Sequence, residues 1–149
     1  MLSTEAEETP LSAADLALFR RIFGKLMYAM VATRLEIAFA VGFLGRYLHK
    51  ATAFHLAIAK GVLAYLKGTI DLGILYHRGS KSDTIKKLPL KGYGDSDFAA
   101  SDTRRSTTGY VFYLAESPIT WCSQLQSLVT TSTTEAEYIS LFEATKEAV

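Results

Sequence analysis

Acidic side chains two positions apart suggest metal chemistry in this sequence. Asp95 and Asp97 come at the end of a segment that favours an extended strand, and alternate residues of extended backbone project from the same face. Carboxylate oxygens grouped in this way suit Mg²⁺ and the cleavage of phosphodiester bonds. The alternative is structural, because Asp and Ser also end strands through local hydrogen bonds.

A second acidic pair follows a predicted helix start. Ser132 is a candidate N-cap, and Glu135 stands where it would complete a capping box. Helix geometry separates Glu137 from Glu135 by about 200°. The positions four, seven and eleven residues after Glu137 are Leu141, Ala144 and Ala148. This stripe predicts that Glu137 faces a sheet, where a carboxylate is costly unless it is paired or binds a metal; the alternative is a solvated rim position.

Two arginines could contact phosphate groups. Arg104 and Arg105 stand among hydroxyl side chains in the segment 103–108, a composition that suits phosphate binding but is also common in ordinary loops. Trp121 and the tyrosines could stack on bases, although aromatic residues at strand spacing more often form core. Cys122 is interpreted as a core or strand-face thiol, because no nearby histidine or cationic helix start supports a nucleophile.

The composition narrows the class of protein. Of the 149 residues 49% are hydrophobic and 21% are charged, which is typical of a globular protein, and the net charge of +1 excludes a strong overall positive field. A single cysteine excludes an intramolecular disulfide and a multi-cysteine zinc site.

Two segments of the sequence indicate the cellular location to expect. Acidic residues near the start of the chain, where a signal peptide would be basic, predict an intracellular protein, cytoplasmic or nuclear, that is not secreted. The most apolar stretch, 26–48, is interrupted by charges, so no association with a membrane is expected.

Hydrophobic periodicity predicts an α+β protein. Three amphipathic helices are expected between residues 12 and 69, the first capped by Ser12 and the last stopped by Gly68. Strands are expected at 72–76, 88–94, 107–114 and 119–123, with a turn at 115–118 and a final helix after Ser132. The predicted domains are 12–69 and 70–149, with their boundary in the polar connector 78–87.

Several ordered motifs resemble the Pol polyproteins of copia-type retrotransposons. They are Gly94-Asp95-Ser96-Asp97-Phe98-Ala99, Arg104-Arg105-Ser106-Thr107-Thr108-Gly109-Tyr110-Val111-Phe112, Trp121 and Ser132-Thr133-Thr134-Glu135-Ala136-Glu137-Tyr138. Upstream, Gly24 to Tyr28, Thr33 to Ala40 and Leu63 to Thr69 look like the helical segment that connects reverse transcriptase to RNase H. The resemblance covers roughly residues 16–149.

The resemblance implies the start of an RNase H fold, with a three-stranded antiparallel portion and the first helix. In that family Mg²⁺ ions hydrolyse the RNA of an RNA–DNA hybrid. Asp95 matches the first catalytic aspartate and Glu137 the catalytic glutamate, so both are expected to be catalytic metal ligands. Asp97 matches a common family position that is not expected to be the principal ligand. Arg104 and Arg105 are the candidate nucleic-acid contacts.

Departures from the family pattern shape the functional expectation. The family carries two further catalytic acidic residues after the glutamate, and these 149 residues do not include them, so we expect a truncated fragment with an incomplete two-ion site and little or no activity alone. Two alternatives stay open: a non-enzymatic nucleic-acid-binding or interaction remnant, and an active RNase H completed by a partner chain. A hydrophobic sheet edge near residues 88–93 also predicts self-association.

Overall fold

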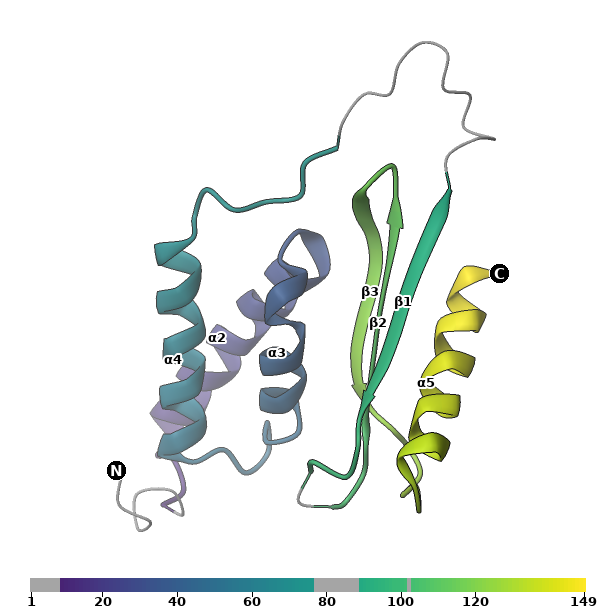
Figure 1. Cartoon of the computed structure of the whole chain (residues 1–149). Helices are drawn as coiled ribbons and strands as arrows, with labels where there is room; N and C mark the ends of the chain where they lie inside the picture. Colours follow the sequence, from purple (N-terminus) through teal and green to yellow (C-terminus); the bar gives the residue numbers. More distant parts are fainter. Residues whose placement is uncertain (1–8, 77–88, 102) are drawn as a thin grey trace. The chain divides into compact units, whose positions relative to one another are not determined.

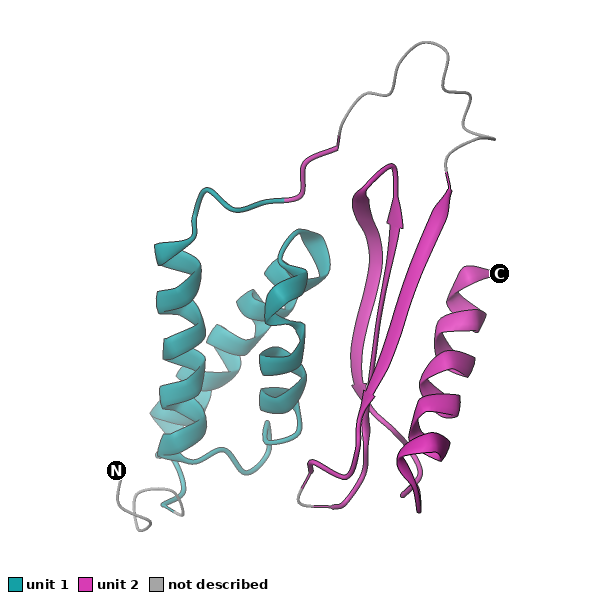
Figure 2. Cartoon of the chain, viewed as in Figure 1, with its two compact units in different colours: residues 1–73 teal, residues 74–149 magenta. Residues whose placement is uncertain are grey.

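The computed structural model describes residues 9–76, 89–101 and 103–149. It divides the chain into two compact units, residues 1–73 and residues 74–149 (Figure 2). The predicted connector 78–87 lies outside the described residues. The domain boundary within it and the identities of the two domains therefore stay predictions.

The first unit is helical. Its elements are α2 (Ala13–Ala32), the short 3-10 helix η1 (Leu35–Ile37), α3 (Ala38–Gly45) and α4 (Ala53–Gly68). Ser12 Oγ accepts a hydrogen bond from the Asp15 amide at 3.1 Å, so the predicted cap of α2 is confirmed. The predicted end of α4 at Gly68 is confirmed as well.

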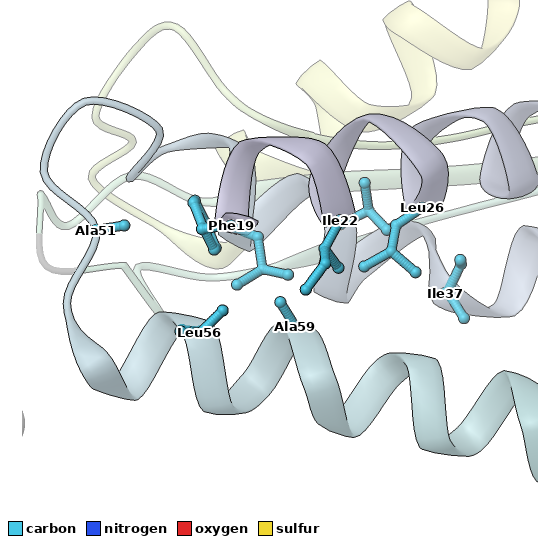
Figure 3. Packing of buried hydrophobic residues seen from close by; sticks show 9 residues of the cluster. Phe19, Ile22, Leu26, Ile37, Ala51, Leu56 and Ala59 are labelled. Atoms are coloured by element: carbon cyan, nitrogen blue, oxygen red, sulfur yellow. The ribbon is translucent and has the colours of Figure 1, made fainter. Parts of the chain in front are cut away.

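An apolar core holds these helices together. Phe19 and Leu26 of α2 and Leu44 of α3 are fully buried, and α4 adds Leu56 and Ala59 (Figure 3). Large aliphatic and aromatic side chains on three helices thus bury one common face, which is the main stabilising term for an amphipathic helix.

The second unit is a sheet with a helix on one face (Figure 1). Strands β1 (Leu90–Asp97), β2 (Thr107–Leu114) and β3 (Ser117–Leu125) pair antiparallel in the order β1-β2-β3, and α5 (Thr133–Ala148) follows. Together with the helical unit this confirms the α+β class and the three-stranded antiparallel portion. No helix in the described ranges is long and apolar enough to cross a membrane.

Several predictions about the strands were wrong, and one of them is the end of β3, which lies at Leu125 rather than at residue 123. The strand predicted at 72–76 is wrong: these residues form no strand, and Leu75 O instead accepts a hydrogen bond from the Ser117 hydroxyl at 2.5 Å. β1 continues two residues past Asp95. The hairpin turn contains only Ala115 and Glu116, whose φ angles of 51° and 63° form the tight left-handed turn that suits strand twist, so β3 begins earlier than predicted.

Candidate functional site

The orientation of β1 follows from its glycines. A Cβ atom placed on Gly94 would lie 3.6 Å from the Ala144 Cβ, so Gly94 faces α5. Successive strand residues point to opposite faces, and Ser96 therefore shares the α5 side with Gly94. Asp95 and Asp97 project together from the face opposite α5, which agrees with the shared face expected from their spacing.

The packing face of α5 differs from the predicted one. The buried residues are Ala136, Ser140 and Ala144, whereas Leu141 is 52% exposed and Ala148 is exposed too. Only Ala144 of the predicted stripe is therefore buried. Small residues at four-residue spacing let the helix approach the glycine-containing strand closely, which Leu141 would prevent. Glu137 is half-buried on the flank of this face rather than in its centre.

A single hydroxyl links α5 to the strand that carries the aspartates. Ser140 Oγ lies 2.6 Å from Asp95 O, to which it donates a hydrogen bond, and 3.4 Å from Gly109 O. Because α5 runs opposite to β1 (Figure 1), Glu137, about one turn before Ser140, lies beside the C-terminal end of β1. The structure therefore brings Glu137 and the two aspartates to the same end of the sheet.

Sequence reasoning missed Ser140 as a positioning residue. A serine within a helix carries no pattern that by itself indicates burial. The signal that indicates its role is its position midway between Ala136 and Ala144, at the spacing of a helix face.

Glu135 has a structural role, as predicted, but with a different partner. Ser132 Oγ accepts from the Glu135 amide at 3.2 Å, while the Glu135 carboxylate accepts from the Thr131 amide at 2.7 Å rather than from Ser132. The Thr131 backbone amide and then its hydroxyl lower the pKa of Glu135. This acid is engaged in capping α5, which leaves Glu137 as the functional candidate.

The oxygen atoms near this end of β1 suit a hard divalent cation. Asp95 Oδ1 accepts from the Ser96 amide at 2.9 Å, and the buried Ser96 hydroxyl has no hydrogen-bond partner in the described part of the chain. Carboxylate and hydroxyl oxygens are ligands that Mg²⁺ prefers. No group of three or more acidic, histidine or cysteine side chains able to hold a metal occurs among the described residues. Ser96 and Asp95 project from opposite faces of β1, so their side-chain oxygens do not form one set of ligands, and magnesium binding stays a prediction.

Hydrogen bonds hold the described residues of the arginine-bearing loop between β1 and β2. Ser101 Oγ accepts from the Arg105 amide and donates to Arg105 O, both at 2.9 Å. Ser106 is fully buried, and its hydroxyl accepts from the Ala99 amide at 3.2 Å and bonds the Thr130 hydroxyl at 2.9 Å. These bonds hold the exposed Arg104 and Arg105 near the end of the sheet that carries Asp97.

A separate pocket of about 100 Å³ lies between the sheet and α5. Its lining includes Tyr110, Cys122 and Glu143. Burial is the main cause that raises the pKa of Tyr110 to about 12, and burial also raises the pKa of Cys122. Both groups therefore stay protonated near neutral pH, which favours the interpretation of Cys122 as a packed thiol.

Several known proteins similar to this chain are transposon polyproteins. The chain is 45% identical over 127 residues to the Retrovirus-related Pol polyprotein from transposon TNT 1-94 of Nicotiana tabacum. It is 40% identical over 130 residues to the corresponding polyprotein from transposon RE2 of Arabidopsis thaliana. These matches cover 85% and 87% of this chain. The chain belongs to the copia-type retrotransposon Pol family.

The coverage of the relatives differs widely. The chain spans 9% of the tobacco polyprotein and 8% of the Arabidopsis one. It is also 39% identical over 127 residues to Secreted RxLR effector protein 161 of Plasmopara viticola, and there the match covers 85% of each protein. No protein-family profile matches the chain, and no solved structure matches it.

Proposed function

We propose that this member of the Pol family derives from the reverse transcriptase and RNase H region, and that its ancestral role is hydrolysis of RNA in RNA–DNA hybrids. The observation that supports this proposal is the 2.6 Å hydrogen bond from Ser140 to Asp95 O, which joins the helix that carries Glu137 to the strand that carries Asp95. Asp95 and Glu137 would hold Mg²⁺, and bound Mg²⁺ supplies activation of water and stabilisation of the leaving oxygen.

Other residues would bind the nucleic acid. Arg104 and Arg105 would contact phosphate groups, because guanidinium groups form paired hydrogen bonds with phosphate oxygens. Selection of the RNA strand would depend on the shape of the hybrid and on its 2′-hydroxyl groups.

A chain with an incomplete two-ion site is expected to be a poor nuclease by itself, since in-line displacement in this family depends on two fixed ions. The test is cleavage of a labelled RNA–DNA hybrid by the 149-residue polypeptide in magnesium or EDTA. We expect little or no cleavage. Magnesium-dependent cleavage that Asp95→Asn and Glu137→Gln both abolish would contradict inactivity while supporting the site.

The metal site needs a readout that is independent of activity. Mn²⁺ in place of Mg²⁺ should broaden NMR signals near Asp95 and Glu137, and Asp95→Asn should remove the broadening. Asp97→Asn is the matched control on the same face of the same strand and should largely keep it. Equal loss in both variants would argue against Asp95 as the specific ligand.

The second candidate is a non-enzymatic nucleic-acid-binding remnant. The observation that favours it is the exposed Arg104–Arg105 pair on a loop held by Ser101 and Ser106. Salt-sensitive binding of hybrid that persists in EDTA would support it. Replacing both arginines by alanine should reduce the slope of log K against log salt by roughly two units, whereas Lys60→Ala on α4 should not. An unchanged slope in the arginine variant would exclude this contact.

The third possibility, an RNase H completed by a partner chain, predicts cleavage only in mixed or oligomeric samples. An intracellular location, cytoplasmic or nuclear, also stays a prediction, and fractionation of cells that express the chain would test it.

A further inference from the structure

A buried glutamine joins three parts of the sheet unit around the candidate site. Gln126 follows directly after β3, and its exposed fraction is only 4%. Its backbone amide donates to Ser106 O at 2.8 Å. Its side-chain Nε2 donates to Thr108 Oγ1 of β2 and to Ala136 O of α5, each at 3.0 Å. Both hydrogens of the amide group are therefore used, and the side chain is held in one orientation.

The bond from Gln126 complements the bond from Ser140. Ser140 donates to Asp95 O, and Ala136 lies one turn earlier on the same buried face of α5. At a rise of about 1.5 Å per residue, the two contacts are about 6 Å apart along the helix axis. A helix held at one point can pivot about it, whereas two points on one face oppose this movement. Glu137 stands between the two contacts.

We propose that Gln126 is a positioning residue of the candidate site, which holds the first turn of α5 and so fixes the direction in which Glu137 projects. The bond to Ala136 O acts on the residue directly before Glu137. The part of this inference that concerns metal binding rests on the proposed function, in which Glu137 is a ligand.

The energetics of the glutamine favour orientation over stability. Gln126 Oε1 is buried and has no hydrogen-bond partner in the described part of the chain. An unpaired buried oxygen costs free energy, which the two donated bonds must offset. Methionine in this position would remove the unpaired oxygen together with both bonds, and Ala136 O would keep its intrahelical bond. Gln126→Met should therefore lose the directional contact with little change in the free energy of unfolding.

The first experiment measures the orientation of α5 without metal. Residual dipolar couplings of backbone amides, recorded for the whole chain in EDTA, report the direction of α5 relative to β1, β2 and β3. Gln126→Met should reduce the couplings of α5 and leave those of the strands unchanged, because the first turn then moves against the sheet. Gln124→Met, the same change at an exposed position of β3, is the matched control and should leave both sets unchanged. Unchanged α5 couplings in Gln126→Met would overturn the proposal.

Urea unfolding separates positioning from a purely structural role. Trp121 fluorescence should show that Gln126→Met shifts the unfolding equilibrium less than about tenfold. A larger shift with unchanged α5 couplings would make Gln126 a structural residue only. If Gln126→Met does not fold, Gln126→Asn replaces it, because an amide one methylene shorter does not reach both acceptors. A folded Gln126→Asn with unchanged α5 couplings would equally overturn the proposal.

The second experiment uses Mn²⁺ as the probe of the metal site. Gln126→Met should lower the apparent Mn²⁺ affinity measured at Glu137 about tenfold, as is typical when a residue that orients a metal ligand is lost. Signals near Asp95 should change less, since β1 keeps its pairing with β2. Absence of Mn²⁺ broadening in the wild type would refute the metal site and leave the coupling result to decide the position of α5. Equal Mn²⁺ affinity despite a displaced α5 would remove Gln126 from the site.

Discussion

The two units of this chain are stabilised by different kinds of interior. The helical unit buries large apolar side chains, of which Phe19, Leu26 and Leu44 are fully inaccessible. In the sheet unit the residues buried to the same degree are Ser106 and Ser140, with Ala136 beside them, and Phe112 is its one large apolar side chain in the buried class among the described residues. The first interior is mainly apolar, with Arg34 and His55 as buried polar side chains, and the second contains many hydrogen-bonded hydroxyls.

The two kinds of interior suit different roles: apolar packing stabilises a unit, and hydrogen bonds position particular groups. Apolar packing is nondirectional and contributes in proportion to the area buried, so it suits a unit whose task is to hold helices together. Hydrogen bonds have specific geometry and a small net free energy. The proposed site residues Asp95, Glu137, Arg104 and Arg105 all lie in the unit that depends on such bonds.

The largest expected effect is in the helical core. Phe19→Ala should reduce the free energy of unfolding of this unit by about 3–5 kcal/mol, because it removes a buried ring and leaves a cavity. Urea unfolding followed by helical circular dichroism measures this change, and fluorescence of the single tryptophan, Trp121, reports the sheet unit. Tyr28→Ala, at a side chain that is 79% exposed on the same helix, is the control. Equal shifts of both signals would contradict separate interiors.

A smaller effect is expected from crowding at β1. A Cβ atom on Gly92 would overlap the Phe112 ring, so Gly92→Ala should destabilise the sheet unit by about 1–3 kcal/mol. Gly94→Ala is the control two residues away, where the added atom would make an ordinary contact of 3.6 Å with Ala144. Trp121 fluorescence during urea unfolding measures both variants. A neutral Gly92→Ala would mean that the ring moves aside without cost.

Removal of the link between α5 and β1 comes next. Ser140→Ala should lower the stability of the sheet unit by about 1–2 kcal/mol, since the 2.6 Å bond to Asp95 O is lost in a buried position. The same variant should change the NMR signals of Asp95. Thr145→Ala is the control, because that exposed hydroxyl donates to Leu141 O within its own helix. Unchanged Asp95 signals would remove Ser140 from the positioning role.

The smallest effect is a pH dependence of the helical unit. Burial, and then the positive charge of Lys50, lowers the pKa of His55 below its ordinary value of 6.5. Neutral His55 accepts a hydrogen bond at Nδ1 from the Thr52 amide at 3.1 Å. The contribution of neutral His55 to the free energy of unfolding should be complete above about pH 6.5. It should fall as the pH drops below that value and level off below the pKa of His55 in the folded state.

Urea unfolding at several pH values measures this dependence. His55→Gln should flatten the plot of unfolding free energy against pH between the pKa values that His55 has in the folded and unfolded wild-type chain. His49→Gln, at an exposed position, should leave this pH dependence unchanged. A slope of opposite sign in the wild type would show that protonated His55 is stabilised instead.

Much of the local structure follows from residues that are neighbours in the chain. The Ser12 and Ser132 caps, the stop at Gly68 and the strand 107–114 were predictable because capping and strand preference act over a few residues. The strand predicted at 72–76 was wrong because strand formation also depends on residues that are distant in the sequence. A short apolar run predicts burial, but whether it joins a sheet depends on a free partner strand.

The candidate site also has features that local sequence predicts and features that depend on tertiary packing. Residue types and motifs were sufficient to place Glu135 in the cap, and they predict Asp95 and Glu137 as site residues, which stays a prediction. The face of α5 that packs against the sheet could not be predicted in the same way, because Glu137 with Leu141 and Ala136 with Ser140 both form plausible helical stripes. Which of the two stripes packs against the sheet depends on how closely the helix can approach Gly94.

Ordered motifs were therefore enough to recognise the family, while composition and short-range periodicity were enough for the α+β class and the order of most elements. The face occupied by Asp95 and the contact of Ser140 with Asp95 required the folded chain. That contact joins residues 45 positions apart. Only close packing of a glycine-bearing strand against a small-residue helix face brings such atoms within hydrogen-bonding distance.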